Sequence, residues 1–345
     1  MIALCVSTGT AALHHAPRTR RDALGLGLAA AAAPFEMPLA AAASGKYPSS
    51  TTLAASNYPS STTLGDGLSF PLASFGLQFY DDATAERLTR LALEAGFRSF
   101  FAQSAAGNQR GFARAVKAAG VPREELFICG SVVSNRALDV DAAYGLAASG
   151  CKANLDALSA GGIAALDMVM LVPGRRDTWP DESVRAQWRA LEDFKAQGGT
   201  RSLAVSNFSP ARLDALLREP GRRVRPTVNQ LPYCVGYHDE TVIAANAQRG
   251  VHVQAWSPLG RGLLTRYQRD APEAKQACAE VGAKYGKSAY QVALRWITQK
   301  GASFTVASQS AAHFAEDLEL FGWQLAPEDM ARLDALNTQR GTTIR

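Results

Sequence analysis

The sequence predicts a closed (β/α)₈ barrel, and three features of the chain indicate this fold class. From Leu68 onward, apolar runs of about four to eight residues alternate with longer amphipathic stretches. Each run is almost continuously hydrophobic, as expected for a parallel strand that is covered on both faces. Eight such strand–helix units fit into about 270 residues, close to the usual size of this barrel. Because no glycine-rich phosphate loop opens a helix, a Rossmann or P-loop domain is not predicted.

The same pattern places each element along the chain. Strands are expected at Leu72–Leu77, Phe97–Phe101, Leu126–Val133, Leu166–Val172, Ser202–Val205, Thr227–Gln230, Val251–Ala255 and Phe304–Ala307. Helices are expected at Ala83–Ala95, Gly107–Ala119, Ala142–Leu158, Glu182–Ala196, Pro210–Arg218, Glu240–Gln248, Ala289–Thr298 and Ala311–Leu320. Two further helices, near Pro272–Lys284 and Pro327–Asn337, lie outside the eight units.

Composition excludes several other classes of protein. With 345 residues, 47% of them hydrophobic and 19% charged, the chain can bury a large core and is not disordered overall. The net charge of +5 is not concentrated in a stripe of basic and aromatic residues, so no nucleic-acid partner is expected. The longest apolar run, Ala23–Ala33, is shorter than the roughly 18 residues of a membrane span. The five cysteines are far apart, so neither a metal site nor a disulfide framework is expected.

Residues 1–45 have the order of a processed targeting presequence. The leader carries no acidic residue up to Arg21, and the Arg20–Arg21 pair precedes the apolar run Ala23–Ala33. Small residues at Ala40–Ala43 could form a cleavage site. A twin arginine of this kind resembles the signals of twin-arginine translocases and, after an acid-poor leader, indicates a plastid protein with the thylakoid lumen as its destination. The alternatives are a secretory signal or an alanine-rich disordered leader, which would give a secreted or a cytoplasmic protein.

A short tandem repeat follows the presequence. Tyr47–Leu53 reads Tyr-Pro-Ser-Ser-Thr-Thr-Leu, and Tyr58–Leu64 repeats it residue for residue. Two copies are too few for a solenoid, and Pro, Ser and Thr favour an extended linker over residues 46–64. The glycines after Leu64 predict a hairpin turn that leads into the barrel. The barrel is expected over residues 65–338, with a tail at 339–345.

The carboxyl ends of the predicted strands, where such barrels carry their chemistry, hold specific polar motifs. They are Ala204-Val-Ser-Asn-Phe208, Val228-Asn-Gln230 and Ala255-Trp-Ser-Pro-Leu-Gly260, followed by Arg295-Trp-Ile-Thr-Gln299 and Glu316–Leu325. Gly96-Phe-Arg98 and Gly107-Asn-Gln109 stand in the amino-terminal half. In this order and spacing the motifs resemble those of the aldo-keto reductases, over about Thr63–Asn337.

This resemblance implies a (β/α)₈ barrel that reduces aldehydes and ketones with a bound nicotinamide cofactor, NADP or NAD. Ser206, Asn207 and Gln230 would then hydrogen-bond the nicotinamide carboxamide, which needs both donors and acceptors. By the same resemblance, Trp256 would stack on the ring, Ser257 and Leu259 would line the pyrophosphate, and Ser308 and Glu316 would reach the adenosine. Taken alone, Ser206–Asn207 could instead be a helix cap before Pro210.

The four catalytic residues of the family are absent from the matching positions. Phe101 stands at the position of the Asp, Ala106 at the Tyr, Ser131 at the Lys and Val172 at the His. A shifted alignment does not restore them, because the chain has no Asp or Tyr over residues 83–138, no Lys over 118–151 and no His over 16–237. General-acid catalysis contributes roughly 10²–10⁴-fold, so carbonyl reduction is not expected.

The cofactor's phosphate site is altered as well. Where the family has a Lys-Ser pair and an Arg for the 2′-phosphate, this chain has Ala307-Ser308 and His313, and Asp317 replaces an Asn. Selection of NADPH over NADH should therefore be weak.

Two interpretations of the function remain. The protein is either an oxidoreductase of this family with another proton donor, or a non-catalytic monomeric barrel that binds a small molecule or a protein partner. Of the remaining histidines, His238 is expected as a cap or rim residue at the sixth helix, and His252 as a packed residue within a strand.

Overall fold

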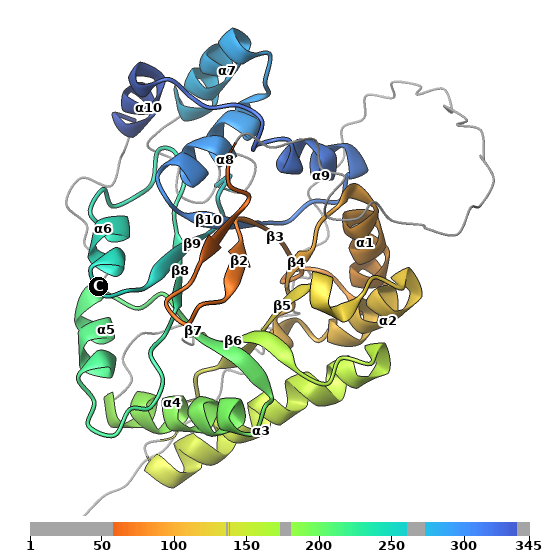
Figure 1. The fold of residues 1–345 in the computed structure, drawn as a ribbon, viewed down its shortest axis with the longest axis vertical. Coiled ribbons are helices and arrows are strands. Elements are labelled where there is room, and N and C mark those ends of the chain that lie inside the picture. The colour runs from red at the N-terminus through yellow and green to blue at the C-terminus, as the bar shows by residue number, and fades with distance from the viewer. Residues whose placement is uncertain (1–57, 136, 138, 173–180, 261–272, 337–345) are drawn as a thin grey trace, which may run out of the picture. The chain divides into compact units, whose positions relative to one another are not determined.

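The computed structural model of the chain describes residues 58–135, 137, 139–172, 181–260 and 273–336. Within these ranges eight parallel strands close into a barrel in the order β10-β3-β4-β5-β6-β7-β8-β9, with helices around it (Figure 1). This arrangement confirms the predicted (β/α)₈ fold. The predicted presequence, the first copy of the repeat and the tail lie outside the described residues.

The elements follow the predicted order, and most bounds differ from the prediction by one or two residues. The barrel strands are β3 (Ala73–Gly76), β4 (Ser99–Phe101), β5 (Phe127–Val133), β6 (Leu166–Val172), β7 (Thr200–Ser206), β8 (Val228–Pro232), β9 (His252–Trp256) and β10 (Ser303–Val306). The surrounding helices are α1 (Asp82–Ala95), α2 (Gln109–Ala119), α3 (Val140–Leu158), α4 (Asp181–Ala196), α5 (Pro210–Leu217), α6 (Val242–Ala247), α8 (Ala289–Gln299) and α9 (Ala311–Leu318). The two additional helices are α7 (Glu273–Tyr285) and α10 (Pro327–Asp334). Short 3₁₀ helices in the described residues are η2 (Ser104–Ala106), η3 (Arg123–Glu125) and η4 (Ser159–Gly161).

Local sequence signals explain where several helices begin. Asp81 accepts a hydrogen bond from the Thr84 amide at the start of α1, and Asp139 accepts one from the Ala142 amide at the start of α3. At α8, the Ser288 side chain and the Gln291 side chain form a reciprocal capping box. Each cap satisfies backbone donors that have no partner inside the helix.

Two separate hydrophobic clusters show how alternation along the strands divides the core. The larger cluster joins side chains such as Phe75, Phe100 and Val169 to the helices. The smaller one contains side chains of strands and of the amino-terminal hairpin alone: Leu64, Phe70, Phe101, Phe127, Cys129, Met168, Met170, Ala204 and Val228. Since successive side chains of a strand point to opposite faces, this second cluster fills the barrel interior.

The hairpin of β1 (Ser61–Thr63) and β2 (Ser69–Pro71) closes the amino-terminal end of the barrel (Figure 1). The predicted turn forms, with the Gly67 amide donating to the Leu64 carbonyl at 2.9 Å and Gly67 at φ 85°. From β2, Phe70 enters the interior, where its ring centroid lies 5.0 Å from that of Phe127.

The expected linker over residues 46–64 is therefore too long at its end. Residues 61–63 form β1, and the Tyr58 amide donates to the Phe321 carbonyl. The Arg295 guanidinium also lies 4.6 Å from the centroid of the Tyr58 ring. The second copy of the repeat is thus part of the fold, because its Thr residues pair with β2 and its Tyr contacts α8.

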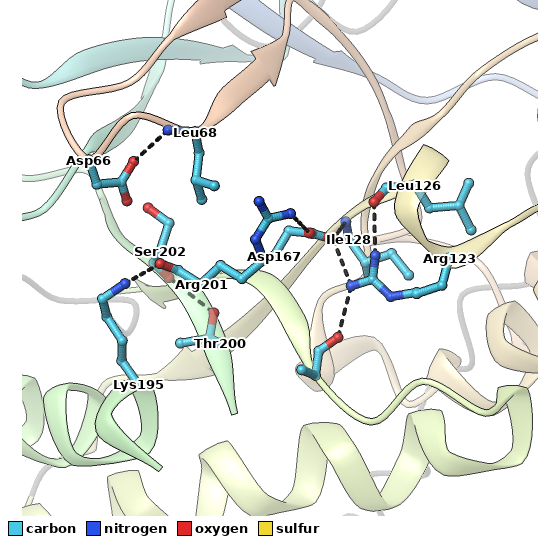
Figure 2. Close-up of polar contacts among 11 residues, drawn as sticks. Asp66, Leu68, Arg123, Leu126, Ile128, Asp167, Lys195, Thr200, Arg201 and Ser202 are labelled. Atoms are coloured by element: carbon cyan, nitrogen blue, oxygen red, sulfur yellow. Dashed lines mark hydrogen bonds and ion pairs between the residues drawn. The ribbon is translucent and has the colours of Figure 1, made fainter. Parts of the chain in front are cut away.

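A buried carboxylate ties together neighbouring strands at this end of the barrel. Asp167 of β6 is 2% exposed, and it accepts hydrogen bonds from the Ile128 amide and from Arg201 (Figure 2). Arg123 pairs at 2.7 Å with Oδ2, the oxygen that also accepts from the Ile128 amide. Three donors around one carboxylate offset the cost of burying its charge, so Asp167 has a structural role.

Among the helices of the described ranges, none has the length and apolar character of a membrane span.

Candidate functional site

A cleft of about 700 Å³ opens at the carboxyl ends of the barrel strands. Residues at the ends of β4, β6, β7, β8, β9 and β10 line it, together with side chains from α8 and α9. All eight residues predicted for the cofactor line this cleft: Ser206, Asn207, Gln230, Trp256, Ser257, Leu259, Ser308 and Glu316. The topology brings them together because parallel strands of a barrel end at one face.

Hydrogen bonds connect the polar residues at the ends of β7 and β8. The Ser206 hydroxyl donates to the Gln230 carbonyl at 3.1 Å, and the Asn207 side-chain amide donates to the Ser206 hydroxyl at 3.0 Å. Ser206 and Gln230 are 2% and 4% exposed, so both side chains are fixed within the wall of the cleft. The helix-cap alternative for this pair does not hold, because Ser209 provides the side-chain cap of α5.

Two residues of the cleft have left-handed backbone conformations. Asn207 has φ 56° and Ser257 has φ 50°, which is uncommon for residues other than glycine. The Trp256 indole donates to the Asn207 side-chain oxygen at 3.0 Å, and the Gly260 amide closes the following turn on the Ser257 carbonyl. The bond between Trp256 and Asn207 joins the ends of β7 and β9, so that the loops after these strands lie on the same wall of the cleft.

A chain of side-chain hydrogen bonds supports this wall from within the barrel. The Gln230 side-chain nitrogen donates to the Gln254 oxygen at 2.8 Å, and the Gln254 nitrogen donates to the Ser74 hydroxyl at 3.3 Å. The Ser74 and Ser99 hydroxyls then share a bond of 2.7 Å. Gln230 is thus oriented through residues of β9, β3 and β4, since each member of the chain satisfies its neighbour.

No ionisable side chain stands at the four positions where the resemblance expects the catalytic residues, and two of these positions lie on the opposite wall of the cleft. Phe101 is 3% exposed and forms part of the interior cluster, and Val172 packs against that cluster; both line the cleft. Ser131 is fully buried, does not line the cleft, and accepts a hydrogen bond from the Ser104 amide. Ala106 lies in η2, away from the lining.

The end of the cleft at α9 carries its ionisable groups. Tyr290, His313, Glu316 and Asp317 line this end. Glu316 accepts a hydrogen bond from Ser288 at 3.3 Å, whereas Asp317 is 5% exposed and has no side-chain partner among the described residues. Burial, and to a smaller degree the charge of Glu316, raises the pKa of Asp317 to about 7.

Several lining residues were not predicted from the sequence, among them Gln78, Gln103, Tyr290 and Thr305. Gln78 follows β3 by two residues and Thr305 lies in β10, so the rule that strand ends carry the site could have found both. The Gln78 side-chain oxygen and the Thr305 hydroxyl are buried without a hydrogen-bond partner within the described ranges. Tyr290 comes from a helix, and the pattern of the strands gives no signal for it.

The histidine predictions had different outcomes. His252 is packed in β9 as predicted, where it lies 3.0 Å from the Ser303 hydroxyl and burial lowers its pKa to about 4. The prediction of a cap or rim role for His238 is wrong: the residue precedes α6, is fully buried, and has its ring 4.8 Å from that of Trp296. Within the part that the structure describes, no group of three His, Cys, Asp or Glu side chains could hold a metal ion.

Comparison with known proteins gives consistent results for sequence and structure. The model of the aldo/keto reductase family matches residues 68–338. An aldo-keto reductase of Mycobacterium avium is 31% identical over 82% of this chain and 91% of its own length, and one of Mycobacterium tuberculosis is 31% identical over 82% and 92%. An aldo/keto reductase structure from Brucella melitensis superposes with a TM-score of 0.71 at 24% identity, covering 81% of this chain and all of the other. An aldo-keto reductase from a Medee basin deep-sea metagenome library gives 0.70 at 21% identity, covering 81% of this chain and 96% of its own.

Proposed function

Because the chain belongs to the aldo/keto reductase family, we propose that its cleft binds a nicotinamide dinucleotide, NAD or NADP, without catalysing carbonyl reduction. The carrying observation is the contrast between the two walls of the cleft. One wall has fixed amide and hydroxyl groups, and the other has Phe101 and Val172 where the family's chemistry requires an acid and an imidazole.

The residues of the polar wall suit the carboxamide of a nicotinamide ring. Ser206, Asn207 and Gln230 offer hydroxyl and amide groups within one cavity, and the bonds among them fix their directions before a ligand arrives. A planar carboxamide needs a donor and an acceptor side by side, which such a set provides. The Trp256 indole is anchored to Asn207 and supplies an aromatic face at the same place. The volume of about 700 Å³ is within the range of small-molecule sites.

Proton transfer is the missing part of the chemistry. A bound nicotinamide supplies a hydride equivalent, but the alkoxide that forms from a carbonyl must also receive a proton from the protein. Near the polar wall the described lining offers hydroxyls and amides, whose pKa values are far above that of an activated tyrosine. Tyr80 does not fill this role, because its hydroxyl donates to the Ser308 carbonyl and burial raises its pKa.

The biological role would then be binding. A monomeric barrel would hold a dinucleotide and, against the apolar wall, a second small molecule or a segment of a protein partner. The wall formed by Phe101 and Val172 favours an apolar group over a polar carbonyl, because neither side chain can form a hydrogen bond with a carbonyl oxygen.

The test combines binding and turnover on the purified protein. NADH and NADPH are titrated while tryptophan fluorescence is recorded, and oxidation of each is then followed with a nitrobenzaldehyde against a heat-denatured control. We expect saturable quenching that Gln230→Ala weakens, and no turnover above the control. Saturable cofactor oxidation that Gln230→Ala abolishes would show that another proton donor has been recruited. An absence of binding by both nucleotides would refute the cofactor assignment.

A further inference from the structure

The α9 end of the cleft has an unusual balance of charge for a site that receives phosphates. Its lining contains two carboxyls, Glu316 and Asp317, and one imidazole, His313, while no Lys or Arg lines the cleft within the described ranges. The imidazole is itself engaged, because its Nδ1 lies 3.3 Å from the Ser308 hydroxyl. The Nζ atom of Lys275 in α7 lies 6.0 Å from the centroid of the Tyr290 ring, but Lys275 does not line the cleft.

Asp317 is the most informative of these groups. It is 95% buried and lines the cleft, yet no hydrogen bond or ion pair satisfies its carboxyl among the residues that the structure describes. Burying a carboxyl without a partner is costly, so its acceptor atoms are available for donors on a ligand. Glu316 differs from it, because Ser288 already donates to one of its oxygens.

We infer that Asp317 makes the cleft selective for a dinucleotide without a 2′-phosphate, so that NAD(H) binds more tightly than NADP(H). This inference rests on the proposed dinucleotide function. Ser206, Gln230 and the α9 residues line one cavity, so a dinucleotide with its nicotinamide at Ser206 and Gln230 would place its adenosine half toward the α9 end. There the ribose hydroxyls or the exocyclic amine of the base can donate to the Asp317 carboxyl.

A phosphomonoester at this end would meet the opposite situation. It carries close to two negative charges at neutral pH and has acceptor oxygens only, and it would lie beside Glu316 and Asp317 in a partly desolvated site. One exposed imidazole is a weak partner compared with the fork of an arginine. Repulsion therefore acts on NADP(H) and not on NAD(H), whose adenosine ribose is uncharged.

The experiment measures the dissociation constants of NAD⁺ and NADP⁺ by calorimetry for the wild type, Asp317→Asn and a control. The titrations are made at pH 8, where Asp317 with its pKa of about 7 is mostly ionised. At this pH Glu328→Gln removes a comparable charge from an exposed site on α10 outside the cleft. We expect the wild type and the control to bind NAD⁺ at least tenfold more tightly than NADP⁺. Asp317→Asn should reduce this ratio to threefold or less, mainly by tighter binding of NADP⁺.

Three outcomes would overturn the inference. If the wild type binds both nucleotides equally, or NADP⁺ more tightly, the α9 end does not select against the phosphate. If Asp317→Asn leaves the ratio unchanged, or if Glu328→Gln changes it as much, Asp317 is not the selecting residue. If neither nucleotide binds to any of the three proteins, the proposed dinucleotide function fails, and the inference fails with it.

Discussion

The two sides of the barrel interior are equally buried but are built from different chemistry. On the side of β4, β5 and β6, apolar side chains such as Phe101, Met168 and Met170 pack as a cluster. Around β8, β9 and β3, Gln230, Gln254 and other polar side chains form a continuous chain of hydrogen bonds. The first arrangement removes polar atoms from the interior, and the second pairs the side chains of Gln230, Gln254 and Ser74 in a chain.

Under the proposed function, this difference would allow proton transfer to be lost while recognition of the nicotinamide is retained. In this family's arrangement, proton transfer would depend on side chains of the apolar side, and recognition of the nicotinamide on those of the polar side. The two sets lie on different strands. The bonds that orient Gln230 run through Gln254 and Ser74 and reach Ser99 of β4, but they do not involve the Phe101 side chain. Substitutions on one side therefore leave the geometry of the other in place.

The most severe way to disturb this division is to put a charge back into the apolar side. Phe101→Asp would remove a large buried side chain, worth about 3–5 kcal/mol, and would also place a carboxylate among Met168 and Met170 without a partner. We expect the free energy of unfolding in urea to fall by at least about 4 kcal/mol at pH 8. Phe101→Leu is the matched control and should cost less than about 1.5 kcal/mol. Equal stability of the Asp and Leu variants would show that a carboxylate is tolerated here and that this wall is not an apolar core.

The sequence was sufficient to predict the barrel, because the strands are short, apolar and regularly spaced. The turn before β2 was also predictable, since Gly67 adopts the positive φ that its turn requires. The polar chain through Gln254 and Ser74 was not predictable, because it joins residues 180 positions apart whose pairing depends on the register of β9, β10 and β3. His238 was misjudged for a related reason: its burial depends on Trp296, a residue of a distant helix.

For the site as well, local motifs could be predicted from the sequence, whereas contacts between distant residues could not. Sequence motifs placed all eight expected cofactor residues in one cleft, because motifs at strand ends converge in any parallel barrel. The isolation of the Asp317 carboxyl could not be read from the sequence. It depends on which groups surround α9 in three dimensions, and residue identity alone does not give that environment.

A smaller effect should come from pH, through His252 near the amino-terminal end of the barrel. Burial lowers the pKa of His252 to about 4, below the value of about 6.5 expected for the unfolded chain. The unfolded state therefore binds more protons, and stability that is present above about pH 6.5 is lost as the pH falls toward 4. Between pH 7.5 and 5 we expect His252 to account for a loss of about 2 kcal/mol, which His252→Asn should remove from the urea-unfolding profile.

Asp317 gives this pH test a control of opposite sign. Its pKa is raised to about 7, so the folded state holds the proton more tightly, and its contribution to stability is lost as the pH rises from about 4 to 7. Asp317→Asn should therefore flatten a decrease toward neutral pH, whereas His252→Asn flattens a decrease toward acid. If the two variants shift the profile in the same direction, the burial of one of these groups has been misassigned.

An effect of similar size, about 1–3 kcal/mol, is expected when the hydrogen-bond chain of the polar side is broken. Gln254→Leu keeps a similar volume but leaves the Gln230 side-chain nitrogen and the Ser74 hydroxyl each without one partner. An unsatisfied buried group costs about 1–3 kcal/mol, so the urea-unfolding free energy should fall by about that amount. Because Gln230 is then no longer held from behind, the affinity for NADH should also fall, by about threefold or more. Gln276→Leu on the exposed face of α7 breaks a hydrogen bond to Glu280 that water can replace, and it should change stability by less than about 0.5 kcal/mol. If Gln254→Leu resembled this surface control in both measurements, the chain would not orient Gln230, and the separation of the two sides would have to rest on packing alone.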